Sequence, residues 1–292
     1  MPEGKTSSPL DWLRTAKDRL RALATGEHVR TERPKVGLAL AGGFARGIAH
    51  IGVIRVLCEA GIPIDCVAGT SVGALIGAAY CAGASCEEMQ AAGQVTSFAD
   101  FGRWTPSWLG LATNQRMERY LARLTAAKNF EELKIPLAIS TSDINEGVSV
   151  FYTSGPIVPP LRASCAYPAL FVPIQYDGRT LVDGFLTAPV PVEGTLLLGA
   201  DVVIAVYLEA GSDGTPRTAA EVIARSFSII QSHNDIAWRP QADVIIEPDV
   251  RPFAWDDFSK TPDLVKAGEE AATKALPEIR ALISGEKKDS AA

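Results

Sequence analysis

Short apolar runs alternate along most of the chain with segments whose apolar residues recur at helical spacing. The first two runs, KVGLALA at 35–41 and IDCVAG at 64–69, both stop at a glycine and are followed by helical patterns. Near-continuous apolar strands that alternate with helices are typical of a largely parallel sheet covered on both faces. Further strands are predicted at 134–143, 147–153, 171–176, 179–184, 200–210 and 242–250.

The helical segments between these runs complete the expected architecture. Together with the strands they predict an α/β domain over 35–284, built as three α/β/α layers around a mainly parallel central sheet. The predicted helices cover 46–60, 71–83, 155–164, 219–235 and 262–283.

Two segments that flank this domain differ from it in composition. Residues 1–34 are polar and charged, and four leucines between Leu10 and Leu23 give them the pattern of a moderately amphipathic helix. We expect this N-terminal helical extension to dock on the domain, with a partner or a membrane surface as the alternatives. The last residues, GEKKDSAA at 285–292, are expected to form a disordered tail.

The stretch FADFGRWTPSWLGL at 98–111 interrupts the alternation of strands and helices. It holds two of the five tryptophans and two phenylalanines, among Gly and Pro residues. Because tryptophan favours boundaries between apolar and aqueous phases, this composition suits a lid or a lipid-facing edge. A small satellite core beneath a long loop is the other interpretation.

Composition and charge narrow the function classes. The 292 residues are 47% hydrophobic and 21% charged, which is typical of soluble globular proteins. A chain of this length can bury a sizeable core without disulfides or a metal. The net charge of −6 argues against nucleic acid as a partner, because phosphate binding needs clustered Lys and Arg. The sequence leaves the oligomeric state undetermined.

Cysteine spacing and apolar run lengths bear on the compartment. The five cysteines form no C-x-x-C pair and no cluster with metal-ligand spacing, which favours a reducing compartment. The N-terminal segment lacks an uncharged apolar core, so we expect no signal peptide, and no run approaches the ~18–20 apolar residues of a membrane span. We therefore expect a cytoplasmic protein, and transient contact with a membrane surface stays open.

The pentapeptide GTSVG at 69–73 places Ser71 between two glycines, where a predicted strand meets a predicted helix. One interpretation is a nucleophile elbow, G-x-S-x-G, in which a tight turn pushes the serine Oγ out of the fold. The other is a small-residue turn in which the serine caps the helix. The pentapeptide alone does not decide between them.

The three histidines supply no evident base for Ser71. A serine hydroxyl needs an activating base, and histidine is the usual one. His28 lies in the polar extension, His50 falls in a predicted helix where a structural role is favoured, and His233 lies in a helical stretch. Ser71 also follows only the second strand, too early for an ordinary α/β-hydrolase. A Ser-His-Asp triad is therefore poorly supported.

Two further glycine-bearing turns, AGGFARG at 41–47 and VDGF at 182–185, also end apolar strands. In a parallel sheet the carboxyl ends of the strands share one edge, where ligands bind, so Asp183 is expected to meet Ser71 there. A carboxylate that ends a buried strand is costly unless it is hydrogen-bonded. Asp183 therefore needs a partner such as the Ser71 hydroxyl.

The turn at 41–47 offers candidates for an oxyanion hole. The backbone N–H groups of Gly42, Gly43 and Phe44 can point at a developing oxyanion, beside the start of a helix. When this turn is taken alone, two other interpretations stay open: a phosphate-binding loop and a purely structural turn. The turn is neither a Walker loop nor a full Rossmann fingerprint.

Two other residues lie near the predicted site. Asp143 ends another strand, and a turn role is favoured over a place in the cleft. Cys165 is a candidate for lining the pocket, and a buried inert thiol is the favoured interpretation.

Taken together, the three turns resemble the signature of the patatin-like phospholipases. That signature is a glycine-rich loop with a basic residue, then G-x-S-x-G, then Asp-Gly and a small residue. Here the stretches read LALAGGFARGIAHIGV, GTSVGA and LVDGFLTAPVPV, and their fixed glycines are Gly69, Gly73 and Gly184. The resemblance runs from about residue 35 to 209, with looser agreement toward 283.

The resemblance implies a serine esterase that hydrolyses acyl esters of (lyso)phospholipids or related glycerolipids. Its dyad would be Ser71 and Asp183, without histidine, metal or another cofactor. Arg46 resembles the basic loop residue, with a role in loop support or head-group attraction, and a surface salt bridge is the alternative. Two other functions stay open: an acyltransferase that forms the same acyl-enzyme, and a lipid-sensing regulatory protein with little turnover.

Two residues depart from the family pattern. Phe44 stands where the family has glycine, which keeps an N–H donor but adds a ring beside the oxyanion hole. Phe185 replaces the small residue after Asp-Gly, which is expected to narrow the pocket. Both leave the dyad intact and bear on substrate size.

Overall fold

The computed structural model describes residues 33–209 and 215–284. The chain divides into two units, Met1–Arg33 and Pro34–Ala292, and every named helix and strand belongs to the second. The helix expected within 1–34 and the tail expected at 285–292 fall on residues that lie almost entirely outside the described ranges.

An eight-stranded sheet forms the centre of the second unit, in the order β10-β9-β1-β2-β5-β8-β7, with β6 paired to β5. Neighbours from β10 to β5 run parallel, whereas β6, β7 and β8 join the sheet through antiparallel pairs. The mainly parallel sheet of the sequence prediction is thus confirmed. The strands are β1 (Val36–Leu40), β2 (Cys66–Thr70), β5 (Leu137–Asp143), β6 (Val148–Tyr152), β7 (Ile174–Tyr176), β8 (Arg179–Asp183), β9 (Val202–Val206) and β10 (Val244–Ile246).

Helices form at all five predicted positions, and short ones appear between them. The pattern at 46–60 becomes a 3-10 turn, η1, followed by α2. The helices α4, α6 and α8 were not predicted, because runs of 9, 8 and 6 residues are shorter than the roughly 11–18 residues over which helical periodicity is read. The helices are η1 (Phe44–Ile48), α2 (Ala49–Glu59), α3 (Val72–Ala82), α4 (Cys86–Gln94), α5 (Phe98–Phe101), α6 (Met117–Leu124), η2 (Phe130–Glu132), α7 (Val158–Ser164), η3 (Gly184–Leu186), α8 (Val192–Leu197), α9 (Ala219–Trp238), η4 (Arg239–Gln241), η5 (Phe258–Lys260) and α10 (Thr261–Ser284).

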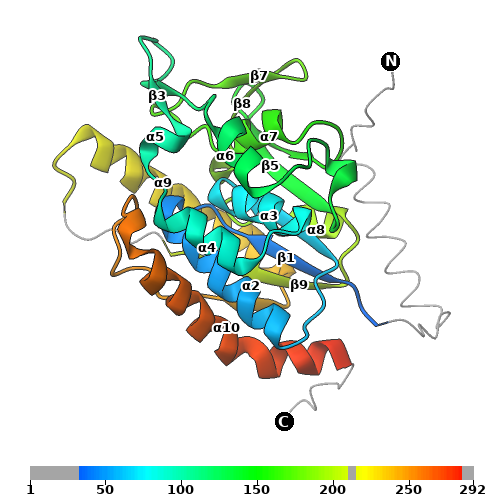
Figure 1. Ribbon diagram of the computed structural model, residues 1–292. Helices are drawn as coiled ribbons and strands as arrows, with labels where there is room; N and C mark the ends of the chain where they lie inside the picture. The colour runs from blue at the N-terminus through cyan, green and yellow to red at the C-terminus, as the bar shows by residue number, and fades with distance from the viewer. Residues whose placement is uncertain (1–32, 210–214, 285–292) are drawn as a thin grey trace. The chain divides into compact units, whose positions relative to one another are not determined.

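Both faces of the sheet carry helices, so the unit has the three layers that the sequence predicted (Figure 1). Val67 and Ala68 of β2 show this, because consecutive residues of a strand point to opposite faces. A Cβ added to Gly77 of α3 would lie 3.1 Å from Val67, and one added to Gly194 of α8 would lie 2.8 Å from Ala68. The sheet is therefore the middle layer.

No helix in the described ranges has both the length and the apolar composition that a bilayer span requires.

The helices α2 and α10 lie side by side over one face of the sheet (Figure 1). Their backbones touch at two glycines, since a Cβ on Gly52 would run into the Val265 carbonyl and one on Gly268 into the Ala49 carbonyl. The C-terminal helix thereby fixes α2 and the turn η1 that precedes it. That turn carries the glycine-rich loop of the candidate site.

The stretch at 98–111 that interrupts the predicted alternation forms α5 and most of a hairpin of β3 (Arg103–Trp104) and β4 (Ala112–Thr113). Ala112 belongs to a small buried cluster with Phe171, so a satellite core does lie under this segment. Trp108, in contrast, is exposed. The satellite core therefore describes part of the segment, and the lid or lipid-facing edge stays a prediction.

Candidate active site

Ser71 occupies the turn between β2 and α3 in a backbone conformation that few L-residues adopt, with φ 53° and ψ −122°. Strain of this kind costs roughly 1–3 kcal/mol and occurs mostly at functional sites. The serine directly precedes α3, but its side chain makes no capping hydrogen bond. The geometry therefore favours the nucleophile elbow over the N-cap serine.

The two motif glycines make this turn sterically feasible. A Cβ on Gly69 would lie 2.5 Å from the backbone nitrogen of Ala74, one turn into α3. A Cβ on Gly73 would lie 2.6 Å from the carbonyl oxygen of Ala41. The elbow can therefore pack directly against the glycine-rich loop that follows β1.

Asp183 reaches Ser71 by a route that differs from the predicted one. The expectation that it lies at a shared carboxyl edge of parallel strands was wrong, because β8 runs antiparallel to β5. Instead, β5 continues beyond the end of β2. Ser140 pairs with Thr70, and the next residue, Thr141, pairs with Asp183. The carboxylate thus arrives from the opposite direction and lies close enough to the Ser71 hydroxyl to interact with it.

The carboxylate of Asp183 is buried and has few donors. One oxygen accepts the Phe185 N–H at 3.0 Å. Burial raises the pKa of Asp183 to about 7, because this hydrogen bond and the interaction with the Ser71 hydroxyl only partly replace the lost hydration. A carboxylate with this pKa accepts a proton from an alcohol far better than a solvated one with a pKa near 3.9.

The glycine-rich loop lies beside the nucleophile, since a Cβ on Gly42 would be 3.5 Å from that of Ser71. Its N–H groups differ from the prediction at one position. The Gly42 N–H donates to the Pro189 carbonyl oxygen at 3.1 Å, so this donor is already used. The N–H groups of Gly43 and Phe44 have no acceptor within the described part of the chain. The candidate oxyanion hole is therefore reduced to these two donors, and Gly42 instead joins the loop to the segment after Asp183.

Two side chains, those of Arg46 and His50, stabilise the glycine-rich loop through hydrogen bonds to backbone carbonyl groups. The Nε of Arg46 donates to the Phe253 carbonyl oxygen at 2.9 Å, which agrees with loop support rather than with a surface salt bridge. The Nε2 of His50 lies 2.8 Å from the Ala41 carbonyl oxygen, and burial lowers the pKa of His50 to about 4. A neutral His50 donating to Ala41 has the structural role expected of it.

His233 and Asp143 do not join the dyad. His233 lies on α9, and His28 falls outside the described residues. Asp143 ends β5, where one carboxylate oxygen accepts the Asn145 N–H at 3.0 Å and the other pairs with Arg179 at 2.9 Å. Asp143 thus serves the turn, as the sequence favoured. Across the described ranges, no three His, Cys, Asp or Glu side chains gather as a metal site would require.

A small apolar cavity of about 50 Å³ opens from Ser71. Phe44 narrows it, with its ring packed edge-on against Trp255 at 4.9 Å and Tyr167 at 6.3 Å between centroids. Phe185 does not line the cavity, contrary to the expectation that it narrows the pocket, because its ring packs on Gly42 and Phe227. The lining residues are Phe44, Ser71, Val72, Leu75, Phe101, Met117, Cys165, Phe171 and Phe258.

Two neighbours of Ser71 come from the end of α7. The Ser164 Oγ accepts the Ser71 N–H at 2.8 Å, a contact that the sequence did not indicate. Cys165 lines the cavity together with Ser71. Burial raises the pKa of Cys165 well above its usual value, so the thiol stays protonated and unreactive. The only sequence signal for Cys165 in the site was its place directly after the helix predicted at 155–164.

The three loops around Ser71 lie in a part of the chain that resembles a known protein family. A family model for patatin-like phospholipases matches residues 38–196, which is more than half of the chain. The chain belongs to the patatin-like phospholipase family. The matched region contains the glycine-rich loop, the elbow and Asp183, so this patatin-like domain has all three parts of the candidate site within it.

Individual relatives agree with the family assignment. The chain is 32% identical over 226 residues to the lysophospholipase nte1 of Emericella nidulans, covering 74% of this chain and 14% of the fungal protein. It is 37% identical over 191 residues to an NTE family protein of Mycobacterium tuberculosis, covering 64% of this chain and 52% of that protein. The patatin-like chain thus spans about a seventh of one relative and about half of the other.

Among solved structures, the crystal structure of VipD from Legionella pneumophila superposes on this patatin-like chain with a TM-score of 0.49 and 13% sequence identity. The superposition covers 84% of this chain and 67% of that chain.

Proposed function

We propose that the chain is a serine esterase that hydrolyses acyl esters of (lyso)phospholipids or related glycerolipids, with Ser71 as nucleophile and Asp183 as base. The observation that carries the proposal is the placement of the strained, elbow-borne Ser71 beside a buried carboxylate, that of Asp183, whose pKa burial raises to about 7. Membership of the patatin-like phospholipase family and a lysophospholipase among the relatives support a lipid ester as the substrate.

In the first half-reaction, the Ser71 Oγ attacks the ester carbonyl carbon while its proton passes to Asp183. The carbonyl oxygen becomes negative and receives hydrogen bonds from the N–H groups of Gly43 and Phe44, where each donor is worth roughly 3 kcal/mol. The C–O bond then breaks, and the proton on Asp183 goes to the departing alcohol. The acyl group is left on Ser71.

In the second half-reaction, Asp183 takes a proton from water as the water oxygen attacks the acyl-enzyme carbonyl. Collapse of this second tetrahedral intermediate returns the proton to Ser71 and releases the fatty acid. No step requires a histidine or a metal ion. The apolar cavity provides the low-dielectric surroundings in which the hydrogen bonds to the oxyanion are strongest.

The test is active-site labelling with a fluorescent fluorophosphonate, followed by mass spectrometry of the labelled peptide. A label on Ser71, together with release of fatty acid from lysophosphatidylcholine, supports the proposal. Release of an acylated alcohol or thiol in place of the acid points to an acyltransferase. A folded protein that takes no label and turns over no ester overturns the proposal and leaves a lipid-sensing protein.

The pH dependence follows from the raised pKa of Asp183. Only the ionised carboxylate can accept the Ser71 proton, so kcat/KM for p-nitrophenyl butyrate is expected to rise with pH to a plateau, with its midpoint near 7. An imidazole ionises in the same range, so His233→Gln is the control and is expected to keep the midpoint. A profile that is flat between pH 5 and pH 9 contradicts Asp183 as the base.

The ring of Phe44 limits the acyl group that the cavity accepts. Phe44 has a φ of 53°, which glycine adopts without strain, so Phe44→Gly both relaxes the loop and opens the cavity. We expect the ratio of kcat/KM for p-nitrophenyl laurate to that for the butyrate to rise about tenfold. Phe44→Leu keeps most of the apolar bulk and is expected to leave this ratio nearly unchanged. Equal ratios in all three proteins would contradict the role of the ring.

A further inference from the structure

Large apolar side chains are exposed on the β3–β4 hairpin. Trp108 near its tip is fully exposed, with a relative accessibility of 104%, and Trp104, Leu109 and Leu111 are each more than half exposed. Soluble proteins rarely gather large exposed apolar side chains in one short segment unless that surface contacts a partner or a membrane. The hairpin projects from the top of the molecule as drawn in Figure 1.

The hairpin is joined directly to the wall of the candidate active site. The Leu111 N–H donates to the Ala169 carbonyl at 3.3 Å, and the Val172 N–H donates to the Ala112 carbonyl at 2.9 Å. Phe171, between these two contacts, lines the cavity that opens from Ser71. Binding of the hairpin to another surface therefore also fixes the position of this cavity wall.

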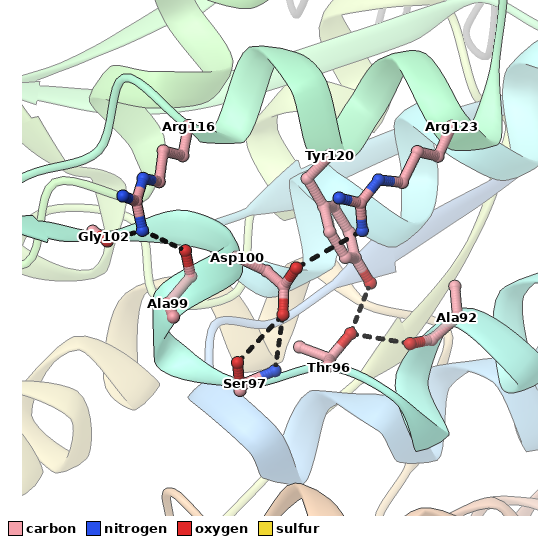
Figure 2. Close-up of polar contacts among 9 residues, drawn as sticks. All are labelled: Ala92, Thr96, Ser97, Ala99, Asp100, Gly102, Arg116, Tyr120 and Arg123. Atoms are coloured by element: carbon pink, nitrogen blue, oxygen red, sulfur yellow. Dashed lines mark hydrogen bonds and ion pairs between the residues drawn. The ribbon is translucent and has the colours of Figure 1, made fainter.

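A polar network fixes the base of the hairpin, as Figure 2 shows. Arg116, the N-cap residue of α6, donates to the Ala99 and Gly102 carbonyl oxygens at 2.9 and 3.5 Å. Asp100 of α5 accepts from Ser97 at 3.0 Å and pairs with Arg123 of α6 at 3.3 Å. These contacts tie α5, which immediately precedes β3, to α6. The exposed tip is thus carried on an anchored base.

The charge around the hairpin differs in sign from that of the whole chain. Between 100 and 124 there are four arginines and two acidic residues, Asp100 and Glu118, whereas the chain as a whole has a net charge of −6. Arg103 at the start of β3 and Arg119 on α6 are both exposed. Because the range of charge interactions is about 8–10 Å in physiological salt, this local excess matters more for docking than the distant acidic residues.

We propose that the β3–β4 hairpin docks the chain on a phospholipid bilayer, with Trp108 and Leu109 inserted at the head-group level. The proposal rests on the proposed function, because a lipid ester hydrolase must take its substrate from such a surface. Tryptophan is the side chain most typical of that level, and arginines beside it attract anionic head groups. Docking turns the cavity wall formed by Phe171 toward the lipids.

The test measures co-sedimentation with vesicles of phosphatidylcholine and phosphatidylserine, in a Ser71→Ala background so that no substrate is consumed. Trp108→Ser combined with Leu109→Ser is expected to weaken binding about hundredfold, since each buried side chain contributes roughly tenfold. Trp108→Tyr, which keeps an interfacial aromatic ring, is expected to retain most of the binding. Ile236→Ser, at a side chain on α9 that is 79% exposed, is the matched control and is expected to bind like the parent.

The same substitutions in the chain with Ser71 intact separate docking from chemistry. The double variant is expected to keep turnover of soluble p-nitrophenyl butyrate and to lose turnover of vesicle-borne lipid. Unchanged vesicle binding by the double variant overturns the proposal. A parent that dimerises through the hairpin in analytical ultracentrifugation, and binds no vesicles, also overturns it in favour of a second copy. Hairpin-dependent binding without any esterase turnover upholds docking and overturns the proposed function alone.

Discussion

Replacing Ser71 by alanine is expected to lower kcat for p-nitrophenyl butyrate by at least about 10⁴-fold, because the acyl-enzyme can no longer form. Residual turnover would come from binding and from the Gly43 and Phe44 donors, which the substitution leaves in place. The measurement is steady-state turnover alongside fluorophosphonate labelling. Turnover within tenfold of the parent would contradict Ser71 as the nucleophile.

A second substitution at the same position separates chemistry from backbone strain. Ser71 has positive φ, which alanine tolerates as poorly as serine, whereas glycine adopts it readily. We therefore expect Ser71→Gly to be as inactive as Ser71→Ala but more stable by about 1–2 kcal/mol in urea unfolding. Equal stability of the two variants would indicate that the elbow stores no strain.

Replacing Asp183 by asparagine is expected to have the second largest effect on activity, a loss of about 10³- to 10⁴-fold in kcat. Asparagine can still accept the Phe185 N–H through its oxygen, so the geometry is kept, but it cannot take the Ser71 proton. The remaining turnover is expected to lose its rise near pH 7. A variant that keeps both the rate and the pH midpoint would contradict Asp183 as the base.

The same variant is expected to be more stable than the parent at high pH. Because burial raises the pKa of Asp183 from 3.8 to about 7, the parent loses stability as pH rises from about 4 to 7, where only the unfolded carboxylate is ionised. Above pH 7 the parent carries the whole cost of the buried charge, roughly 2–4 kcal/mol, which Asp183→Asn avoids. The difference in free energy of unfolding should shrink toward pH 4.

Asp143→Asn is the matched control for this stability change. Asp143 is also buried, but its Arg179 partner and backbone donors hold its pKa below the ordinary value. Its contribution to stability is present at neutral pH and is lost as pH falls, so Asp143→Asn is expected to destabilise the protein at pH 8. If both asparagine variants shift stability in the same direction, the raised pKa of Asp183 is contradicted.

The sequence predicted the layers and the candidate site through features that are local in the chain. The apolar runs that became β1, β2 and β9 are buried on both faces, so their composition alone indicated parallel strands. Gly69 is needed for a steric reason that acts within a few residues, because its Cβ would meet the backbone of Ala74. Such constraints are written into one segment at a time, and a single sequence can reveal them.

The features that the sequence did not predict depend on pairing between distant segments. The antiparallel direction of β8 is set by its register on β5, since an apolar run reads the same in either direction. Likewise, nothing near Gly42 indicates that Pro189 takes its N–H. The helix α4, which a capping box of Ser85 and Glu88 begins, was missed although its start signal is local. Its low apolar content concealed the helical period.

The catalytic groups of the site and most of its cavity wall come from two different sets of segments. The nucleophile follows β2, the base ends β8 and the oxyanion donors follow β1. The strands β1 and β2 pair directly, and the Gly42 N–H joins the loop after β1 to Pro189, which follows β8. Most of the cavity wall comes from α5, α6, η5 and the loop after α7. Acyl-chain preference can therefore diversify, in evolution or in directed selection, by insertions and substitutions in the second set while the chemistry of the first is inherited unchanged.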